Sequence, residues 1–425
     1  DGVPKDLIQI DVELSVKENS LNSTVTESIV DSAVKLLGLH TESSSALKSF
    51  ASKFKERFED REVPLMHALD PEIGIGYEGA NNKNTDIPLL LVGLNIEQSN
   101  NISRSMNWTK LIEYQLHKLS DAYRNNAKEI QVTDEDISFL SDGIAKLNPN
   151  SFAIMGSLLA GSSEDIDRGN WMFQLDHIAG PSAATLLGRF GGQNHTLVSK
   201  LRNYVEAEEA TDTNAIFAEI VHMPQTKLGN VIIRPQYRKY EIPYVTFSTV
   251  PQDQQIHISD LFVSVRNGKV ILRSKRLNRR VVPRLTNSHY FGHRSSLPVY
   301  KFLGDLQERY FFKWNWGMMG DNEFLPRVTY KNIILSRAQY NINIKTIEKK
   351  GGTLQKYLQS IINDNKPLRY LVLCEGDNEL LIDIESKHCI EILQNRLNRH
   401  GRILLEEFPG TPENCFVTDR NNNKY

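Results

Sequence analysis

The chain has 425 residues, of which 40% are hydrophobic and 24% are charged. This globular composition excludes both a membrane protein and a disordered chain, and the length is too great for one ordinary core, so we expect two to four domains. The formal net charge of −2 conceals a strongly uneven distribution of charge along the chain.

Targeting and redox signals are few. No apolar run approaches the roughly 18 residues that a membrane-spanning helix needs, and the N-terminus lacks the basic and apolar regions of a signal peptide. The cysteines Cys374, Cys389 and Cys415 have no metal-ligand spacing, and their odd number disfavours a secreted disulfide framework. We therefore expect a cytoplasmic protein without a bound metal.

The first half of the chain mixes helix and strand patterns. Alternation predicts a strand over 6–16, and helical spacing predicts helices over 22–39, with Ser23 or Thr24 as the cap, and over 43–59. The segment 61–79 is short, apolar and broken by Pro and Gly, which is typical of a functional loop. Further helices are predicted over 108–123, 134–146 and 195–210, strands over 152–159 and 172–178, and a turn into a short helix over 180–190.

From residue 216 the apolar runs shorten to strand length. Strand-like runs at 216–223 and 230–233 flank a turn, and Arg234-Pro235 ends the second run. Asn267-Gly268 is the strongest short hairpin signal and joins strands predicted over 256–265 and 269–274. The remaining chain predicts helices over 297–310, 352–363 and 388–399, and strands over 332–335, 370–373, 379–384 and 402–408.

These strands form hairpins rather than a regular β-α-β alternation. The fold class we predict is therefore α+β, with mostly antiparallel hairpin sheets in several subdomains. We divide the chain into an α+β region at 1–205, a β-rich region at 206–300 and an α/β region at 301–425.

The stretch from Leu261 to Arg294 is the firmest functional signal. It holds nine Lys or Arg residues and no Asp or Glu. A cationic run of this length attracts phosphates, and RNA fits it better than a small ligand does. The alternative is a solvated surface whose counter-charges lie elsewhere in the fold. The candidate contacts are Arg266, Lys269, Arg273, Lys275, Arg276, Arg279, Arg280 and Arg284.

Two single residues also stand out. Arg234, at the end of a predicted strand, is either a clamp for a carboxylate or phosphate, or a structural ion pair with an acid such as Glu219 or Glu241. Asp70 is either the N-cap of a helix or an acid that orients or deprotonates a hydroxyl. The glycines that follow it leave little helix to cap.

The common catalytic motifs are absent: the sequence has no phosphate-binding loop, zinc-protease motif, nucleophile elbow or dinucleotide fingerprint. Asp176, His177 and Ser182 suggest a catalytic triad. Adjacent residues of one strand point to opposite faces, however, so we favour a structural role for these three.

Six blocks, in this order, resemble the lantibiotic dehydratase family, and together they cover the chain from about residue 62 to 384. They are EVPLMHALDPEIGIG at 62–76, GPSAATLLGRF at 180–190, EIVHMPQTKLGNVIIRPQYRKYEIPY at 219–244, DLFVSVRNGKVILRSKRLNRRVVPRLTNSHY at 260–290, LPVYKFLGDLQ at 297–307 and LVLCEGDNELLIDI at 371–384.

The resemblance implies an enzyme part that takes glutamate from glutamyl-tRNA and esterifies Ser and Thr of a ribosomal precursor peptide. A separate domain of the family then eliminates the glutamate to leave dehydroamino acids. By the same resemblance, Asp70 and Arg234 belong to the glutamylation site: the arginine holds the glutamyl carboxylate or developing charge, and the aspartate orients the hydroxyl or accepts its proton. The basic run would then meet the tRNA backbone.

The resemblance also sets the expected partners. Glutamyl-tRNA is the co-substrate and no other cofactor is implied; the precursor peptide is the substrate, and a homodimer and other lanthipeptide-maturation proteins are further partners. The family's early arginines, leader-binding region and elimination domain have no counterpart here, so we expect an internal fragment that is inactive alone.

Two other functions stay open: an aminoacyl-tRNA-dependent enzyme that extends a peptide, and a non-catalytic RNA- or peptide-binding scaffold. A separation of Asp70 and Arg234 beyond the ~10 Å over which two side chains engage one ligand would favour the scaffold.

Overall fold

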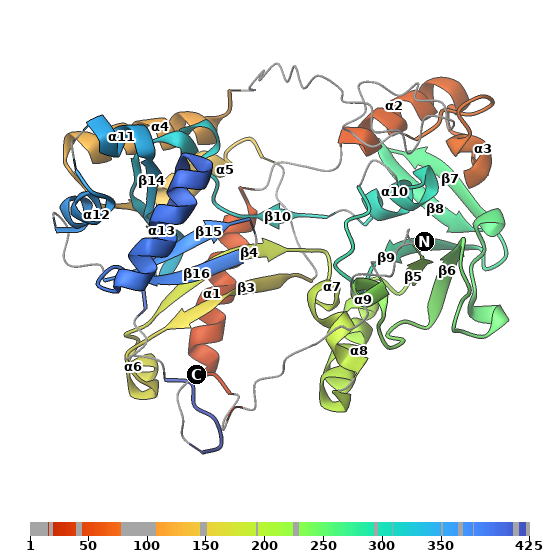
Figure 1. Ribbon diagram of the computed structural model, residues 1–425. Helices are drawn as coiled ribbons and strands as arrows, with labels where there is room; N and C mark the ends of the chain where they lie inside the picture. Colours follow the sequence, from red (N-terminus) through yellow and green to blue (C-terminus); the bar gives the residue numbers. More distant parts are fainter. Residues whose placement is uncertain are drawn as a thin grey trace, which may run out of the picture.

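The structure of the chain is a computed structural model. It describes residues 16, 20–39, 45–77, 108–144, 151–192, 194–223, 229–292, 296–307, 309–349, 352–363, 369–376, 378–410 and 416–421. These residues form an α+β fold with three sheets, which confirms the predicted fold class. Figure 1 shows the first sheet with its helices on one side of the molecule and the other two sheets on the other side.

The first sheet carries most of the segments that the sequence singles out. In spatial order its strands are β1 (Val63–Pro64), β7 (Leu261–Arg266), β8 (Lys269–Ser274), β9 (Arg279–Arg284), β5 (Ala215–His222) and β6 (Tyr240–Tyr244). Strand β5 runs parallel to both of its neighbours, whereas β7, β8 and β9 are successive antiparallel strands.

Helices cover both faces of this sheet. Ile216, Ala218 and Ile220 alternate along β5 and are buried in one core with α2 (Ser45–Phe58), α3 (Leu65–Leu69) and α10 (Pro298–Asp305), so these helices lie on one face. The residues between them, Phe217 and Glu219, point to the opposite face, on the side of α8 (His195–Ala210). In Figure 1, α2 and α3 lie above the strands and α8 lies below them.

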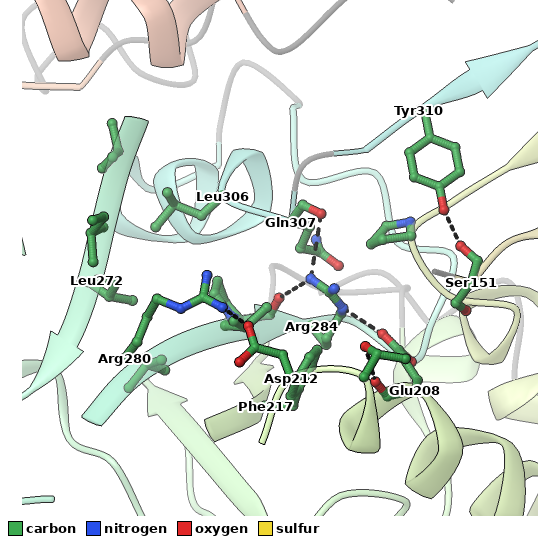
Figure 2. A pocket seen from close by; sticks show the side chains of 17 residues that line it. Ser151, Glu208, Asp212, Phe217, Leu272, Arg280, Arg284, Leu306, Gln307 and Tyr310 are labelled. Carbon is green, nitrogen blue, oxygen red and sulfur yellow. Dashed lines mark hydrogen bonds and ion pairs between the residues drawn. The ribbon is translucent and has the colours of Figure 1, made fainter. Parts of the chain in front are cut away.

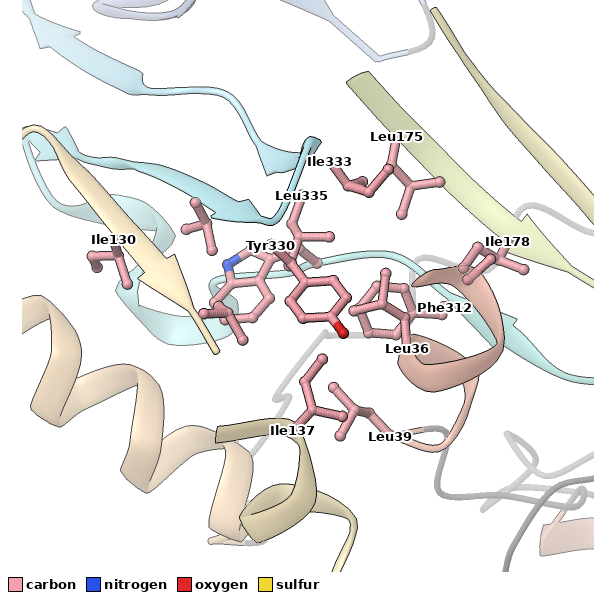
Figure 3. Close-up of a cluster of buried hydrophobic side chains, with 14 of the residues drawn as sticks. Leu36, Leu39, Ile130, Ile137, Leu175, Ile178, Phe312, Tyr330, Ile333 and Leu335 are labelled. Atoms are coloured by element: carbon pink, nitrogen blue, oxygen red, sulfur yellow. The ribbon is translucent and has the colours of Figure 1, made fainter. Parts of the chain in front are cut away.

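The second sheet contains β10 (Phe311–Phe312), β4 (Met172–Ala179), β13 (Ile333–Ser336), β12 (Arg327–Tyr330) and β2 (Glu129–Val132) in that order, with β3 (Ala153–Leu159) paired to β4. Its core is built with α1 (Ser23–Leu37), α4 (Lys110–Arg124) and α5 (Asp134–Ser141). Figure 3 shows Leu36 of α1, Phe312 of β10 and Ile137 of α5 gathered around the ring of Tyr330.

The third sheet has the order β11 (Phe324–Leu325), β14 (Gln339–Asn343), β17 (Arg402–Glu407), β15 (Tyr370–Glu375) and β16 (Asn378–Asp383). It packs against α11 (Ile344–Lys349), α12 (Leu354–Asn363) and α13 (Lys387–His400). The other short elements are α6 (Ser163–Asp167), α7 (Ala184–Leu187), α9 (Gly229–Ile232) and the 3-10 turns η2 (Gly188–Gly192), η3 (Gln252–Gln254), η4 (Ile258–Asp260) and η5 (Gly317–Asp321).

Most predicted elements are present, and the hairpin has the expected turn, with φ of 50° at Asn267 and 75° at Gly268. Several details were wrong. Strand β7 begins only at Leu261, and helix α5 ends at Ser141. The run 230–233 lies largely in helix α9, not in a strand. Helix α10 ends at Asp305, short of 310. The cap of α1 is Asn22, whose side-chain oxygen accepts a hydrogen bond from the Thr24 N–H at 3.0 Å.

The division at 205 and 300 stays a prediction, although the second sheet joins strands from both sides of these boundaries. The strand predicted over 6–16 lies outside the described residues except for Val16, which bridges Asp419. Every helix within the described ranges is too short or too polar to cross a lipid bilayer.

Candidate active site around Arg234

The carboxyl ends of β5, β6 and β9 lie side by side, because β5 is parallel to both neighbours. The register pairs Glu219 with Arg284 and His222 with Tyr244, so the side chains near this edge come from all three strands. Ligands of open sheets with parallel strands bind outside the carboxyl ends of those strands. This edge of the first sheet is therefore the natural place to look for a site.

Arg234 is fixed at this edge by three groups. Its Nη2 lies 2.6 Å from Oε1 of Glu219, its Nε donates to Oγ1 of Thr286 at 2.7 Å, and its Nη1 donates to the carbonyl of Ile232 at 3.1 Å. The side chains of Arg234 and Glu219 are only 9% and 5% exposed. The backbone N–H of Thr286 also donates to Oε1 of Glu219, at 2.9 Å. The ion pair with Glu219 that the sequence suggested is thus present.

This pair belongs to a larger buried network. Arg238 binds Glu208 and Glu209 at 2.8 Å each, and Arg284 binds Glu208 at 2.7 Å. Ser182 donates to the same Glu208 carboxylate at 2.9 Å. Burial opposes the charge of Glu208, but the guanidiniums of Arg238 and Arg284 outweigh it and hold the pKa of Glu208 below its ordinary 4.5. The Glu208 carboxylate is therefore ionised at neutral pH.

The segment 180–190 packs directly against the Arg234 network. The hydroxyl of Tyr237 donates to the carbonyl of Gly188 at 2.8 Å. A Cβ at Gly188 would lie 2.1 Å from the carbonyl oxygen of Thr286, so only glycine lets the two chains approach this closely. Three of the sequence blocks, at 180–190, 219–244 and 260–290, thus converge on one buried centre.

A cavity of about 330 Å³ lies beside this centre, between β9, α8 and the end of α10. Figure 2 shows Glu208 and Arg284 pointing toward each other on one side of it, and Arg280 and Asp212 paired on the other. Each of these cations has an acidic partner. The charges of these four residues therefore cancel, and they give the cavity a polar lining without a net charge.

Asp70 lies at the carboxyl end of α3, not at the start of a helix. Its Oδ1 accepts hydrogen bonds from the backbone N–H groups of Glu72 at 2.8 Å and Ile73 at 3.0 Å, and these two bonds lower the pKa of Asp70. A Cβ on Gly74 would lie 2.0 Å from the His67 carbonyl, which explains the glycine after this turn. The carboxylate caps a tight turn, as an N-cap does for a helix.

The structure does not bring Asp70 and Arg234 into contact. Helix α3, which ends at Leu69 just before Asp70, packs on β7 and α10, whereas Arg234 binds Glu219 on the opposite face of β5. Two strands separate β7 from β5, and three spacings of about 4.8 Å place these strands about 14 Å apart. A shared role in one site remains a prediction.

The basic run meets counter-charges from other elements. Four of its arginines pair with acids outside the run: Arg266 with Asp60, Arg273 with Glu62, Arg280 with Asp212 and Arg284 with Glu208. The side chain of Arg284 is only 12% exposed, which leaves it little surface for a phosphate.

Of the other five cations of the run, Arg294 lies outside the described residues, and the remaining four have varied settings. Arg276 donates to backbone carbonyls, as does Arg279, Lys275 lies over the Phe262 ring, and Lys269 is exposed beside the hairpin turn. Contact of the run with tRNA stays a prediction. Lys269 and Lys275 are exposed members of the run that form no ion pair with any described residue.

Two other chemical groupings have structural explanations. Ser182 is buried against Glu208, and His177 stacks on the ring of Phe311 at 5.4 Å, so Asp176, His177 and Ser182 do not form a triad. Among the described residues, Cys374, Glu379 and Glu406 hold ligand atoms within 4.8 Å of one another.

Arg337 binds both of these glutamates and supplies the positive charge that a metal would bring. Burial raises the pKa of the Cys374 thiol to about 12, which disfavours the thiolate that metals bind.

The sequence did not identify Glu208, Arg238 or Thr286 as members of the network. One signal was visible: the helix predicted over 195–210 ends in acidic residues, and its Glu208 and Glu209 are the partners of Arg238. Which arginines they pair with depends on long-range packing, which no local pattern carries.

Comparison with known sequences places this geometry in context. The family model described as lantibiotic dehydratase, N terminus, matches residues 1–393. Epidermin biosynthesis protein EpiB from Staphylococcus epidermidis is 24% identical over 436 aligned residues, which span 99% of this chain and 40% of EpiB.

Solved structures share the fold. The crystal structure of the tRNA dependent lantibiotic dehydratase MibB from Microbispora sp. 107891 has a TM-score of 0.73 at 21% identity, covering 92% of this chain and 38% of MibB. The glutamylation domain TbtB from thiomuracin biosynthesis has a TM-score of 0.53 at 17% identity, covering 91% of this chain and 47% of the TbtB chain. The chain thus spans about two fifths of the length of EpiB and of MibB.

Proposed function

Because the chain belongs to the family of lantibiotic dehydratase N-terminal regions, we propose that it forms part of a glutamyl-tRNA-dependent peptide dehydratase. In this proposal it contributes to the transfer of glutamate from tRNA to Ser or Thr of a ribosomal precursor peptide. The observation that carries the proposal is the guanidinium of Arg234, which an ion pair and two hydrogen bonds fix at the carboxyl ends of β5 and β9. Support also comes from MibB, described as tRNA dependent, and TbtB, described as a glutamylation domain.

The chemistry suits an arginine held in this way. An aminoacyl ester is already activated, so a transfer site must orient the attacking hydroxyl, bind the glutamyl group and stabilise the oxyanion. Among the described residues, the contacts of Arg234 use each of its three nitrogens once. A guanidinium has five N–H donors, so two remain for the carboxylate or carbonyl oxygen of a glutamyl group.

Asp70 enters the proposal as the residue that orients the peptide hydroxyl or accepts its proton. Its Oδ1 is used by the turn, and Oδ2 is the atom proposed to face the substrate. The proposal has glutamyl-tRNA as the co-substrate, without another cofactor, and the precursor peptide as the substrate. It also includes a homodimer, other maturation proteins as partners, and a location in the cytoplasm. The chain alone is expected to be inactive.

Binding of tRNA is the test that the chain itself permits. We expect its affinity for glutamyl-tRNA to fall steeply with salt, because each phosphate contact releases counterions. Absent binding, or an affinity independent of salt, contradicts the tRNA part of the proposal.

A non-catalytic RNA- or peptide-binding scaffold is the second candidate, favoured by the missing contact between Asp70 and Arg234. A scaffold predicts that the chain binds tRNA or peptide. It also predicts that substitutions at these two residues have no effect on glutamyl transfer.

A further inference from the structure

His222, the last residue of β5, has a defined protonation state. Its Nδ1 lies 2.9 Å from the carbonyl oxygen of Tyr244, its register partner on β6. A carbonyl oxygen only accepts hydrogen bonds, so Nδ1 carries the proton and Nε2 presents a lone pair. No described residue forms a hydrogen bond with Nε2. The imidazole is therefore a proton acceptor at the carboxyl edge of the parallel strands.

The surroundings of His222 keep the ring neutral. The rings of Tyr300 on α10 and Tyr244 on β6 lie 4.5 Å and 5.4 Å from it. His289 follows beyond Tyr300, with its Nδ1 2.8 Å from the Tyr300 hydroxyl. Glu219 points to the other face of β5, so no described carboxylate faces the imidazole. Burial lowers the pKa of His222 below its ordinary 6.5 despite the bond to Tyr244, so the ring is unprotonated at pH 7.

Exposed residues border His222 at this edge. His222 itself is buried, at 8% exposed, whereas Met223 and Val245, which directly follow the two strands, are strongly exposed. Val245 has φ of 53°, a conformation that β-branched residues seldom adopt and that gathers at functional sites. The carbonyl held by His222 belongs to the peptide group just before Val245. The histidine thus anchors a strained, accessible corner.

The same corner adjoins the Arg234 centre. Glu219 and Arg234 both lie within electrostatic reach of the Tyr300 hydroxyl, and the Tyr300 ring contacts His222. A ligand at the carboxyl ends of β5, β6 and β9 therefore has a cation from one face of the sheet and a neutral imidazole from the other. Glutamyl transfer needs a group that stabilises developing charge and a group that accepts a proton. The cation and the neutral imidazole supply these two groups.

We propose that His222 is the catalytic base of glutamyl transfer, an inference that rests on the proposed function and leaves Asp70 the role of orienting the hydroxyl. Nε2 takes the proton of the Ser or Thr hydroxyl as the hydroxyl oxygen bonds to the glutamyl carbonyl carbon. The bond from that carbon to the ribose oxygen of the tRNA breaks, and Nε2 returns the proton to this oxygen. The imidazole ends the cycle neutral, ready for the next transfer.

The test uses His222→Asn in the complete dehydratase that carries this chain, in single-turnover transfer of labelled glutamate from tRNA to the precursor peptide. Asparagine keeps an N–H donor toward the Tyr244 carbonyl but has no group at the position of Nε2. We expect the transfer rate to fall at least about 100-fold, with the affinities for tRNA and peptide unchanged. His257→Asn is the matched control, because this histidine is exposed, and it should transfer at the wild-type rate.

The pH profile gives a second, independent readout. The wild-type rate should fall as acid protonates Nε2, at a pH below the ordinary 6.5, whereas the residual rate of the variant should lack this step. A variant with the wild-type rate, or a wild-type pH profile identical in shape to that of the variant, overturns the role of His222. A wild-type enzyme that transfers no glutamate at all refutes the proposed function itself.

Discussion

Replacing Arg238 by methionine should severely destabilise the chain. The side chain of Arg238 is fully buried and binds Glu208 and Glu209 at 2.8 Å, with Glu219 at 3.9 Å. With Arg234 and Arg284, it balances these three carboxylates by three guanidiniums. Methionine fills part of the volume but leaves one buried carboxylate charge in excess. Breaking a buried ion pair in this way costs about 3–5 kcal/mol, a large part of the ~5–15 kcal/mol that holds a typical protein folded.

Urea unfolding followed by tryptophan fluorescence measures this loss as a lower midpoint at an unchanged slope. Arg280→Met is the matched control. Arg280 also belongs to the first sheet and pairs with Asp212, but the two side chains are 46% and 31% exposed. Exposed pairs contribute about 0–1 kcal/mol, so this variant should unfold close to the wild type.

Equal unfolding midpoints for Arg238→Met and Arg280→Met would refute the reasoning. So would a loss below about 1 kcal/mol for Arg238→Met, because it would place the network in a solvated environment. A change in slope would instead indicate that the variant alters the folded or unfolded ensemble.

Three further predictions follow from the site. Asp70→Asn keeps the oxygen that caps the turn and removes the charge, so it should retain stability and lose transfer activity. Asp70→Ala should also unfold at a lower urea concentration, because it loses the cap. Full activity of Asp70→Asn would show that this residue only caps the turn. Replacing Lys269 and Lys275 together by Gln should reduce the slope of log affinity for tRNA against log salt concentration by about two units. The control Lys387→Gln should leave this slope unchanged. An unchanged slope for the double variant would show that the two lysines do not contact tRNA. The folded-state pKa of Glu208 is depressed below 4.5, so the contribution of Glu208 to stability is present above pH 4.5 and is lost as the pH falls through the folded-state pKa. The free energy of unfolding of Arg238→Met should therefore depend less on pH in this range than that of the wild type. Parallel pH profiles of the two proteins would contradict the ion pair between Arg238 and Glu208 as the cause.

The sequence predicts local elements well where one period dominates. The helix over 195–210 and the strand over 269–274 have the predicted bounds, because an amphipathic pattern or a hairpin turn determined each of them. Strands β6 and β9 were not predicted, since Arg279 and Arg280 are adjacent exposed cations and Pro243 interrupts β6. Their positions beside β5 come from parallel pairing over long sequence separations.

The candidate site shows the same limit. Arg234 stood out by its place at the end of an apolar run, and an ion pair with Glu219 was among the alternatives. Thr286, which fixes the guanidinium from the end of β9, and Arg238, which lies between three carboxylates, were not singled out. Both are positioned by contacts between segments that are distant in sequence, and the position of Asp70 on another part of the sheet also depends on the tertiary fold.

Glutamyl transfer by an Arg234→Lys variant tests the central claim most directly. In the complete dehydratase, labelled glutamate is supplied on tRNA and its appearance on the precursor peptide is followed. Lysine keeps the positive charge near Glu219 but lacks the planar fork of donors. We predict transfer by the wild type and by the control Arg402→Lys, whose side chain is exposed on the third sheet, and a loss of about 100-fold or more for Arg234→Lys with peptide binding retained. Transfer by Arg234→Lys at the wild-type rate would contradict a glutamylation site built around Arg234.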